Sequence, residues 1–294
     1  MRFRKGARLD TSQVEDARGA SGTGFGFPKV AMAGGGGVVG VIVLLLTMFL
    51  GGGGGGGNGV PGIGLAGDNT DLESECKTGA AAEERTDCRV VAVVNSVQDF
   101  WSSTFSEGGA DYSKAPTVLF TQGVSTACGS ASSSTGPFYC PGDERVYLDL
   151  SFFTDMRTQL GAQGGSFVQA YVIAHEYGHH VQHLLGDDDR VGDDRRGATS
   201  ASVRLELQAD CYAGVWTHNA EETRVVESIS ESDVRDGLDA AAAIGDDRLQ
   251  RRATGDIDPD SFTHGTSEQR QRWFTRGYQS GSADDCNTFA ATSL

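Results

Sequence analysis

The sequence has little positive charge for its length. Its 294 residues include 24 lysines and arginines against 40 aspartates and glutamates, a net charge of −16 at pH 7. Proteins that bind nucleic acid neutralise phosphates with basic side chains, so this balance argues against a nucleic-acid partner. The cysteines form no CxxC pair, which argues against a zinc site made of cysteines. No second linker follows residue 70, and we therefore expect residues 71–294 to form one domain.

The basic residues gather before an uncharged apolar run. Residues 1–29 carry six basic and three acidic groups, whereas the rest of the chain is acidic. Residues 30–50 carry no charge. As a helix this run would reach roughly 31 Å, the thickness of a bilayer core, so we expect it to be a transmembrane helix. The alternative is a cleaved signal peptide, whose apolar core would be shorter and would end in an Ala-x-Ala pattern.

The charge asymmetry also predicts an orientation. Basic residues flanking a span favour the cytoplasm, so residues 1–29 would be a cytoplasmic head on a single-pass protein of the cytoplasmic membrane. Residues 51–70 would be a glycine-rich linker, and residues 71–294 would lie outside. Six cysteines, all after the apolar run, agree with an oxidising compartment. Of the 15 possible pairings, proximity favours Cys76–Cys88 and Cys128–Cys140, leaving Cys211–Cys286.

Strands come early and helices late, which indicates an α+β fold. A helix is expected over residues 83–105, and β-branched, aromatic-rich segments predict strands at 116–122 and 145–150, with a loop between them. Later helices are expected over residues 166–185, 202–219, 232–244 and 266–278. Ser166 with Gln169 predicts a capping box at the start of the first, and Gly186 predicts its end.

The sequence HEYGH at residues 175–179 fits the pattern H-E-x-x-H. Residues i and i+4 share a helix face, so His175 and His179 can bind one zinc ion. Glu176 is rotated by about 100° and lies beside the open position of the metal, where it can accept a proton from a zinc-bound water. The apolar residues of this helix group opposite the histidines, which predicts that the histidine face lines a cleft.

A catalytic zinc site needs a third protein ligand. Glu206 and Asp210 lie four residues apart in a predicted helix and share one face. Two histidines and one glutamate leave a position for water, so we predict that Glu206 completes the ligand set. Asp210 would accept a hydrogen bond from the outer nitrogen of a ligand histidine. The alternative for both acidic residues is a solvated helix surface.

Two further histidines lie near the motif. His180 is rotated away from His179 and is expected to be structural. A closed, all-histidine structural zinc site through His183 is the alternative to an open catalytic site.

Several segments resemble the bacterial family of putative neutral zinc metallopeptidases, within the broader H-E-x-x-H…E class. They are RFRKGARLDTSQVEDARG, the glycine-flanked apolar run, PFYCPGDERVYLDLSFF, YVIAHEYGHHVQ, RLELQADCYAGVW and SFTHGTSEQRQRWFTRGY. The resemblance covers most of the chain and implies a zincin-like domain, with an active-site helix beside a small sheet. In that class an edge strand often binds extended substrate, and Arg145–Leu150 is the strand that we expect to do so.

His264 is the candidate for stabilising a developing oxyanion. It precedes a capped helix that carries Arg270, and the segment loosely resembles a His-Pro-Pro…Arg element of membrane-bound zinc peptidases, with glycine in place of proline. The alternative is that His264 only precedes the helix and has no role in catalysis.

We therefore expect a Zn²⁺-dependent endopeptidase that acts on protein or peptide substrates outside the cytoplasmic membrane. A zinc amidase acting on cell-wall peptides would use the same ligands. A non-catalytic zinc-dependent binding protein is a further alternative, although it would have no need of the Glu176 carboxylate.

Overall fold

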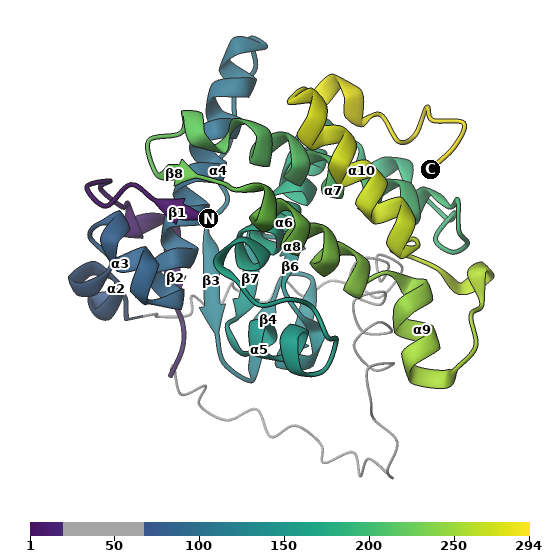
Figure 1. Cartoon of the computed structure of the whole chain (residues 1–294), viewed down its shortest axis with the longest axis horizontal. Coiled ribbons are helices and arrows are strands. Elements are labelled where there is room, and N and C mark those ends of the chain that lie inside the picture. Colours follow the sequence, from purple (N-terminus) through teal and green to yellow (C-terminus); the bar gives the residue numbers. More distant parts are fainter. Residues whose placement is uncertain (20–67) are drawn as a thin grey trace.

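The computed structural model describes residues 1–19 and 68–294 (Figure 1). Its strands are β1 (Arg2–Phe3), β2 (Val14–Asp16), β3 (Thr117–Phe120), β4 (Gly123–Thr126), β5 (Gly129–Ser132), β6 (Phe138–Cys140), β7 (Arg145–Asp149) and β8 (Val226–Ser228). Its α-helices are α2 (Thr70–Glu75), α3 (Gly79–Glu84), α4 (Thr86–Glu107), α5 (Ser151–Thr158), α6 (Ser166–Leu185), α7 (Ala201–Asn219), α8 (Glu231–Ala243), α9 (Asp246–Thr254) and α10 (Ser267–Ser280). Helices predominate over small sheets, which confirms the α+β prediction.

The predicted transmembrane helix 30–50, and most of the predicted linker, lie outside the described residues. Among the helices of the described ranges, none has the length and apolarity needed to cross a bilayer.

The main sheet has the strand order β2-β3-β7-β6. Strands β2, β3 and β7 are parallel, and β6 is antiparallel to β7. All four residues of β3 are buried, as expected for an apolar, β-branched strand inside a sheet. The prediction that Arg145–Leu150 is an edge strand is wrong, because β7 is hydrogen-bonded to β3 on one side and to β6 on the other. Within the described residues, the edges of this sheet are β2 and β6.

The helical core is built around α6 and α7. Helix α7 packs against both α6 and α10, and α4 packs against α6. Figure 1 shows α10 running alongside α7 at the C-terminal side of the molecule. Nearly every residue of α6 from Phe167 to Gln182 is buried, including the residues of the histidine face. Residues of α7 cover much of that face.

Helix ends follow the sequence signals in part. Gly186 ends α6 in the left-handed conformation (φ 74°), and Thr266 with Gln269 forms the predicted capping box of α10. The capping box predicted for α6 is absent, because Gly165 occupies the N-cap position and Ser166 is already helical. The segment 123–142, expected to be a loop, contains β4, β5 and β6, and α9 was not predicted.

Three disulfides join the cysteines in the pattern favoured by proximity, Cys76–Cys88, Cys128–Cys140 and Cys211–Cys286. The described residues contain no free cysteine. Disulfides persist in oxidising compartments, so they indicate that the domain is extracytoplasmic.

The first 18 residues are part of the folded domain, which differs from the expected separate head. Strand β1 pairs with β8, and β2 pairs with β3 in the main sheet. Phe3 and Val14 are buried in the core, and Glu15 forms a 2.6 Å ion pair with Arg145 of β7. The separate head was predicted from the basic residues of this segment, but charge alone does not show which strands pair.

Candidate active site

Helices α6 and α7 bring together His175, His179 and Glu206. The Nε2 atom of His175 lies 3.3 Å from one carboxylate oxygen of Glu206, and Nε2 of His179 lies 3.6 Å from the other. The three ligand atoms all lie within 4.8 Å of one another. The second such cluster among the described residues contains Cys76 and Cys88, whose sulfurs are bonded to each other and offer no thiolate.

This donor set fits a zinc ion. Ligand atoms about 2.0–2.1 Å from a tetrahedral zinc lie roughly 3.3 Å apart, close to the separations of the carboxylate oxygens from the two imidazole nitrogens. Imidazole nitrogen and carboxylate oxygen are both zinc ligands, and three protein ligands leave one position for water.

A close helix approach makes this geometry possible. A Cβ atom at Gly178 would lie 3.0 Å from both the Cα and the carbonyl oxygen of Ala209. A side chain at residue 178 would require α6 or α7 to shift by a few tenths of an ångström where they carry the candidate ligands. The fourth residue of HEYGH therefore has a packing role that the H-E-x-x-H pattern does not reveal.

Asp210 lies behind His175, with its Oδ1 atom 2.9 Å from Nδ1 of the imidazole. The same carboxylate accepts hydrogen bonds from Arg270 (Nε to Oδ2, 2.8 Å) and from the Tyr171 hydroxyl (2.6 Å). All four side chains are buried. Because Asp210 accepts, Nδ1 of His175 carries the proton and Nε2 is directed towards Glu206.

The charges in this cluster shift its titration. Burial works against ionisation of Asp210, but Arg270 and His175 outweigh it and lower the pKa of this carboxyl to about 2. Burial likewise opposes the imidazolium form of His175, but Asp210 outweighs it and raises the pKa of His175 to about 9. For Glu206, burial is outweighed by His264, His179 and His175, and the pKa is lowered well below its ordinary value. The carboxyl groups of Asp210 and Glu206 are therefore ionised at neutral pH.

His179 has a neutral partner instead. Its Nδ1 atom lies 2.8 Å from Oε1 of Gln182, whose amide nitrogen donates to the carbonyl oxygen of Leu205 (2.6 Å) and to Oε1 of Gln208 (2.9 Å). These two donations orient the amide so that its oxygen accepts from Nδ1 of His179. Burial lowers the pKa of His179 to about 4, so the ring is neutral at pH 7.

Glu176 is buried beside the cluster, with 8% of its surface exposed. Burial raises the pKa of its carboxyl group to about 7, against the opposing effect of the positive charge on His175. A carboxyl group with a pKa near neutrality can both accept and return a proton, as a general base and acid must.

His264 approaches the cluster from the segment before α10. Its Nδ1 atom lies 2.9 Å from the Thr263 hydroxyl and 3.3 Å from Oδ1 of Asp246. The other oxygen of Asp246 accepts the backbone N–H groups of Thr263, His264 and Gly265 at 2.7, 2.7 and 3.0 Å, which fixes the loop. Burial opposes the charged ring, but Glu206 and Asp246 outweigh it and raise the pKa of His264.

The remaining histidines of α6 have other partners. His180 lies between the Tyr139 hydroxyl (3.0 Å from Nδ1) and the Ser113 carbonyl oxygen (2.6 Å from Nε2). His183 is part-exposed and pairs with Asp188 at 2.7 Å. Neither belongs to the metal-ligand cluster, so nothing here favours the closed all-histidine site.

Sequence reasoning missed four residues that hold the site. Tyr171 and Gln182 stand four residues before His175 and three after His179, so helical spacing could have suggested both. Asp246 begins the unpredicted helix α9, and Arg270 was noted only as a neighbour of His264. Their roles depend on contacts between helices that are distant in sequence.

Comparison with known proteins agrees with this geometry. The family model described as "Putative neutral zinc metallopeptidase" matches residues 1–289. The uncharacterized protein Rv2575 of Mycobacterium tuberculosis is 49% identical over 228 residues, which cover 75% of this chain and 76% of that protein. The uncharacterized protein YpfJ of Escherichia coli K12 is 49% identical over 202 residues, covering 67% of this chain and 69% of that protein. No solved structure matches the chain. With nearly its whole length matched, the chain belongs to the putative neutral zinc metallopeptidase family.

Proposed function

We propose that the protein is a zinc-dependent endopeptidase that hydrolyses protein or peptide substrates outside the cytoplasmic membrane. The observation that carries the proposal is the convergence of His175, His179 and Glu206 with a buried carboxylate, Glu176, at their side. Family membership supports a metallopeptidase, and the disulfides support the compartment.

The candidate ligands would hold Zn²⁺, which when bound supplies Lewis-acid polarisation of a water molecule and of the substrate carbonyl. Glu176 accepts the proton of the attacking water and delivers it to the leaving amine, because its buried carboxyl group lies beside the candidate ligands. Asp210, held by Arg270, accepts the Nδ1 proton of His175, so Nε2 is the nitrogen that would lose its proton and bind a metal.

His264 is proposed to stabilise the developing oxyanion of the substrate. The ring is fixed through Nδ1 by Thr263 and Asp246, and its raised pKa favours a charged hydrogen-bond donor. Such a donor acts where negative charge develops in the transition state.

The substrate strand is better assigned to β6 than to β7. Strand β6 forms the outer edge of the main sheet, has no strand on its far side among the described residues, and contacts α6. The backbone of Tyr139 in this strand lies close enough to Glu176 to lower the pKa of its carboxyl group. An extended peptide added along β6 would therefore pass close to the proposed base.

The test is cleavage of a library of linear peptides by the full-length, zinc-loaded protein, with products identified by mass spectrometry. Glu176→Gln should retain zinc and lose about 10²–10⁴-fold in kcat, because it removes the base and leaves the metal ligands. Glu231→Gln, at an exposed residue that begins α8, is the control.

Cell-wall peptides belong in the same assay. Cleavage of amide bonds in those substrates with none in linear peptides would support the zinc amidase instead. Stoichiometric zinc without cleavage of either substrate, in wild type and variant alike, would indicate a non-catalytic zinc-binding protein and overturn the proposal.

A further inference from the structure

The N-terminal segment completes the main sheet of the domain. Strand β2 lies parallel to β3, with Val14, Glu15 and Asp16 opposite Thr117, Val118 and Leu119. Val14 is fully buried, and the carbonyl oxygen of Leu119 accepts the backbone N–H of Ala17 at 2.8 Å. Without β2, the inner strand β3 would expose its hydrogen-bonding edge.

Asn69 joins the two ends of the chain that flank residues 20–67. Its side-chain oxygen accepts the backbone N–H of Asp16 at 2.7 Å, and its side-chain nitrogen donates to the carbonyl oxygen of Val14 at 2.9 Å. The described residues before and after 20–67 therefore lie within hydrogen-bonding distance of each other.

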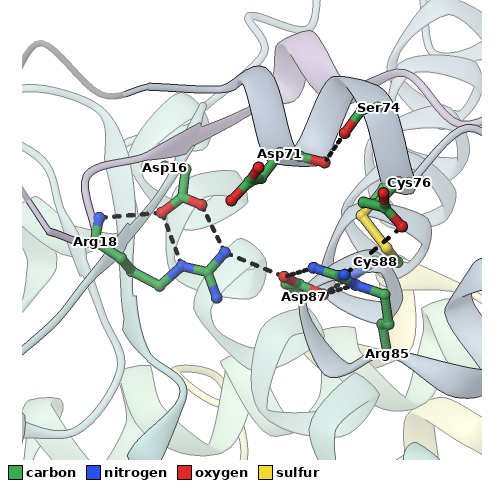
Figure 2. The surroundings of a disulfide bond; sticks show 9 residues. Asp16, Arg18, Asp71, Ser74, Cys76, Arg85, Asp87 and Cys88 are labelled. Carbon is green, nitrogen blue, oxygen red and sulfur yellow. Dashed lines mark hydrogen bonds and ion pairs between the residues drawn. A yellow bond between two sulfur atoms is a disulfide. The ribbon is translucent and has the colours of Figure 1, made fainter.

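A charged cluster fixes the same junction (Figure 2). The guanidinium group of Arg18 bridges Asp16 at 2.6 Å and Asp87 at 3.1 Å, and Arg85 binds Asp87 from the other side at 2.9 Å. Asp87 is buried and lies next to Cys88, whose disulfide to Cys76 holds α2 against α4. Two arginines lower the pKa of Asp87 to about 2 despite its burial, so the carboxylate is charged when it holds Arg18.

These contacts conflict with a single crossing of the membrane between residues 18 and 68. One crossing would separate the two ends by the bilayer core, about 30 Å, whereas Asn69 directly contacts Val14 and Asp16.

We propose that residues 1–18 lie on the same side of the membrane as residues 68–294, as a permanent edge of the extracytoplasmic domain. This replaces the orientation expected from the basic residues of the head.

A pair of exposed residues offers a direct test. Arg8 and Thr78 form an isolated antiparallel bridge, flanked by hydrogen bonds from Leu9 to Lys77 (3.1 Å) and from Gly79 to Ala7 (2.9 Å). This is the non-hydrogen-bonded type of pair, with Cα atoms about 4.5 Å apart, within the range that a disulfide spans. Both side chains are exposed, so cysteine at either position should leave the fold intact.

Full-length Arg8→Cys/Thr78→Cys is expressed in cells and trapped with an alkylating agent, and its disulfides are mapped by mass spectrometry. We expect a fourth disulfide in most molecules. The mismatched control is Arg8→Cys/Glu107→Cys, whose second cysteine lies at the C-terminal end of α4. It should form no fourth disulfide. The single variants Arg8→Cys and Thr78→Cys are then treated with a membrane-impermeant maleimide on intact cells.

The two single variants should react alike with the impermeant reagent. Reaction at residue 78 with protection at residue 8 until the membrane is disrupted, together with no fourth disulfide, would overturn the proposal. The measurement requires no catalytic activity, so its failure and that of the proposed peptidase function can be told apart.

Discussion

At the scale of single residues, Glu176 is buried and its carboxyl group is only partly ionised near neutral pH. Its pKa is raised to about 7 because the carboxylate is removed from water. A raised carboxyl pKa means that the folded protein binds the proton more tightly than the unfolded chain does. The carboxyl group therefore opposes folding increasingly as the pH rises from the unfolded value of about 4.3 towards 7.

Glu176→Gln should consequently stabilise the metal-free protein at high pH. Each unit of pKa shift corresponds to about 1.4 kcal/mol, so the variant should gain up to about 3 kcal/mol in free energy of unfolding above pH 7. The gain should shrink as the pH falls and vanish below about pH 4. Denaturant unfolding from pH 4 to 8 measures it, with Glu231→Gln as the control. A gain independent of pH would contradict the raised pKa.

The two candidate histidine ligands have partners of different charge. His175 faces the ionised Asp210, which is neutralised by Arg270, whereas His179 faces the neutral amide of Gln182. Both partners leave Nε2 as the nitrogen that points to Glu206. The sequence predicted the first of these contacts as a possibility, because Glu206 and Asp210 share a helix face, but not which histidine would take part.

At the scale of helices and strands, amphipathic segments with clear end signals were predicted well. The capping box at Thr266 and the glycine at 186 both occur as expected. Helix α9 was missed because its sequence is almost entirely polar, with only Asp246 and Leu249 buried. Its position depends on Asp246 holding the loop before α10, a contact that no local pattern shows.

The close approach of α6 and α7 predicts the effect of a methyl group between them. Gly178→Ala would place Cβ 3.0 Å from the backbone of Ala209, so α6 and α7 would have to shift by a few tenths of an ångström. Overpacking should cost about 1–3 kcal/mol, offset by roughly 1 kcal/mol from the better helix propensity of alanine. Zinc affinity should fall by about tenfold, because the shift also displaces Asp210, which orients His175.

Calorimetric zinc titration and thermal unfolding measure these two effects. Gly6→Ala, at a glycine with open space around it, serves as control and should change neither. A variant at residue 178 with unchanged affinity would show that the helix separation does not set the site.

At the scale of the whole molecule, sequence and structure differ most at the N-terminus. The composition predicted that residues 1–29 are separate from the domain. In the structure, Val14 pairs with Thr117, more than a hundred residues away. Such pairing is not visible in local charge or periodicity. The disulfides were more accessible to prediction, because two of them close short loops of 12 residues.

The central claim is that His175, His179 and Glu206 hold one zinc ion in an open site. X-ray absorption at the zinc edge of the full-length protein tests it most directly. The account predicts one zinc per chain, with nitrogen and oxygen ligands at about 2.0–2.1 Å and outer-shell scattering from two imidazoles. Sulfur ligands at about 2.3 Å, scattering from three or more imidazoles, or the absence of stoichiometric zinc would contradict it.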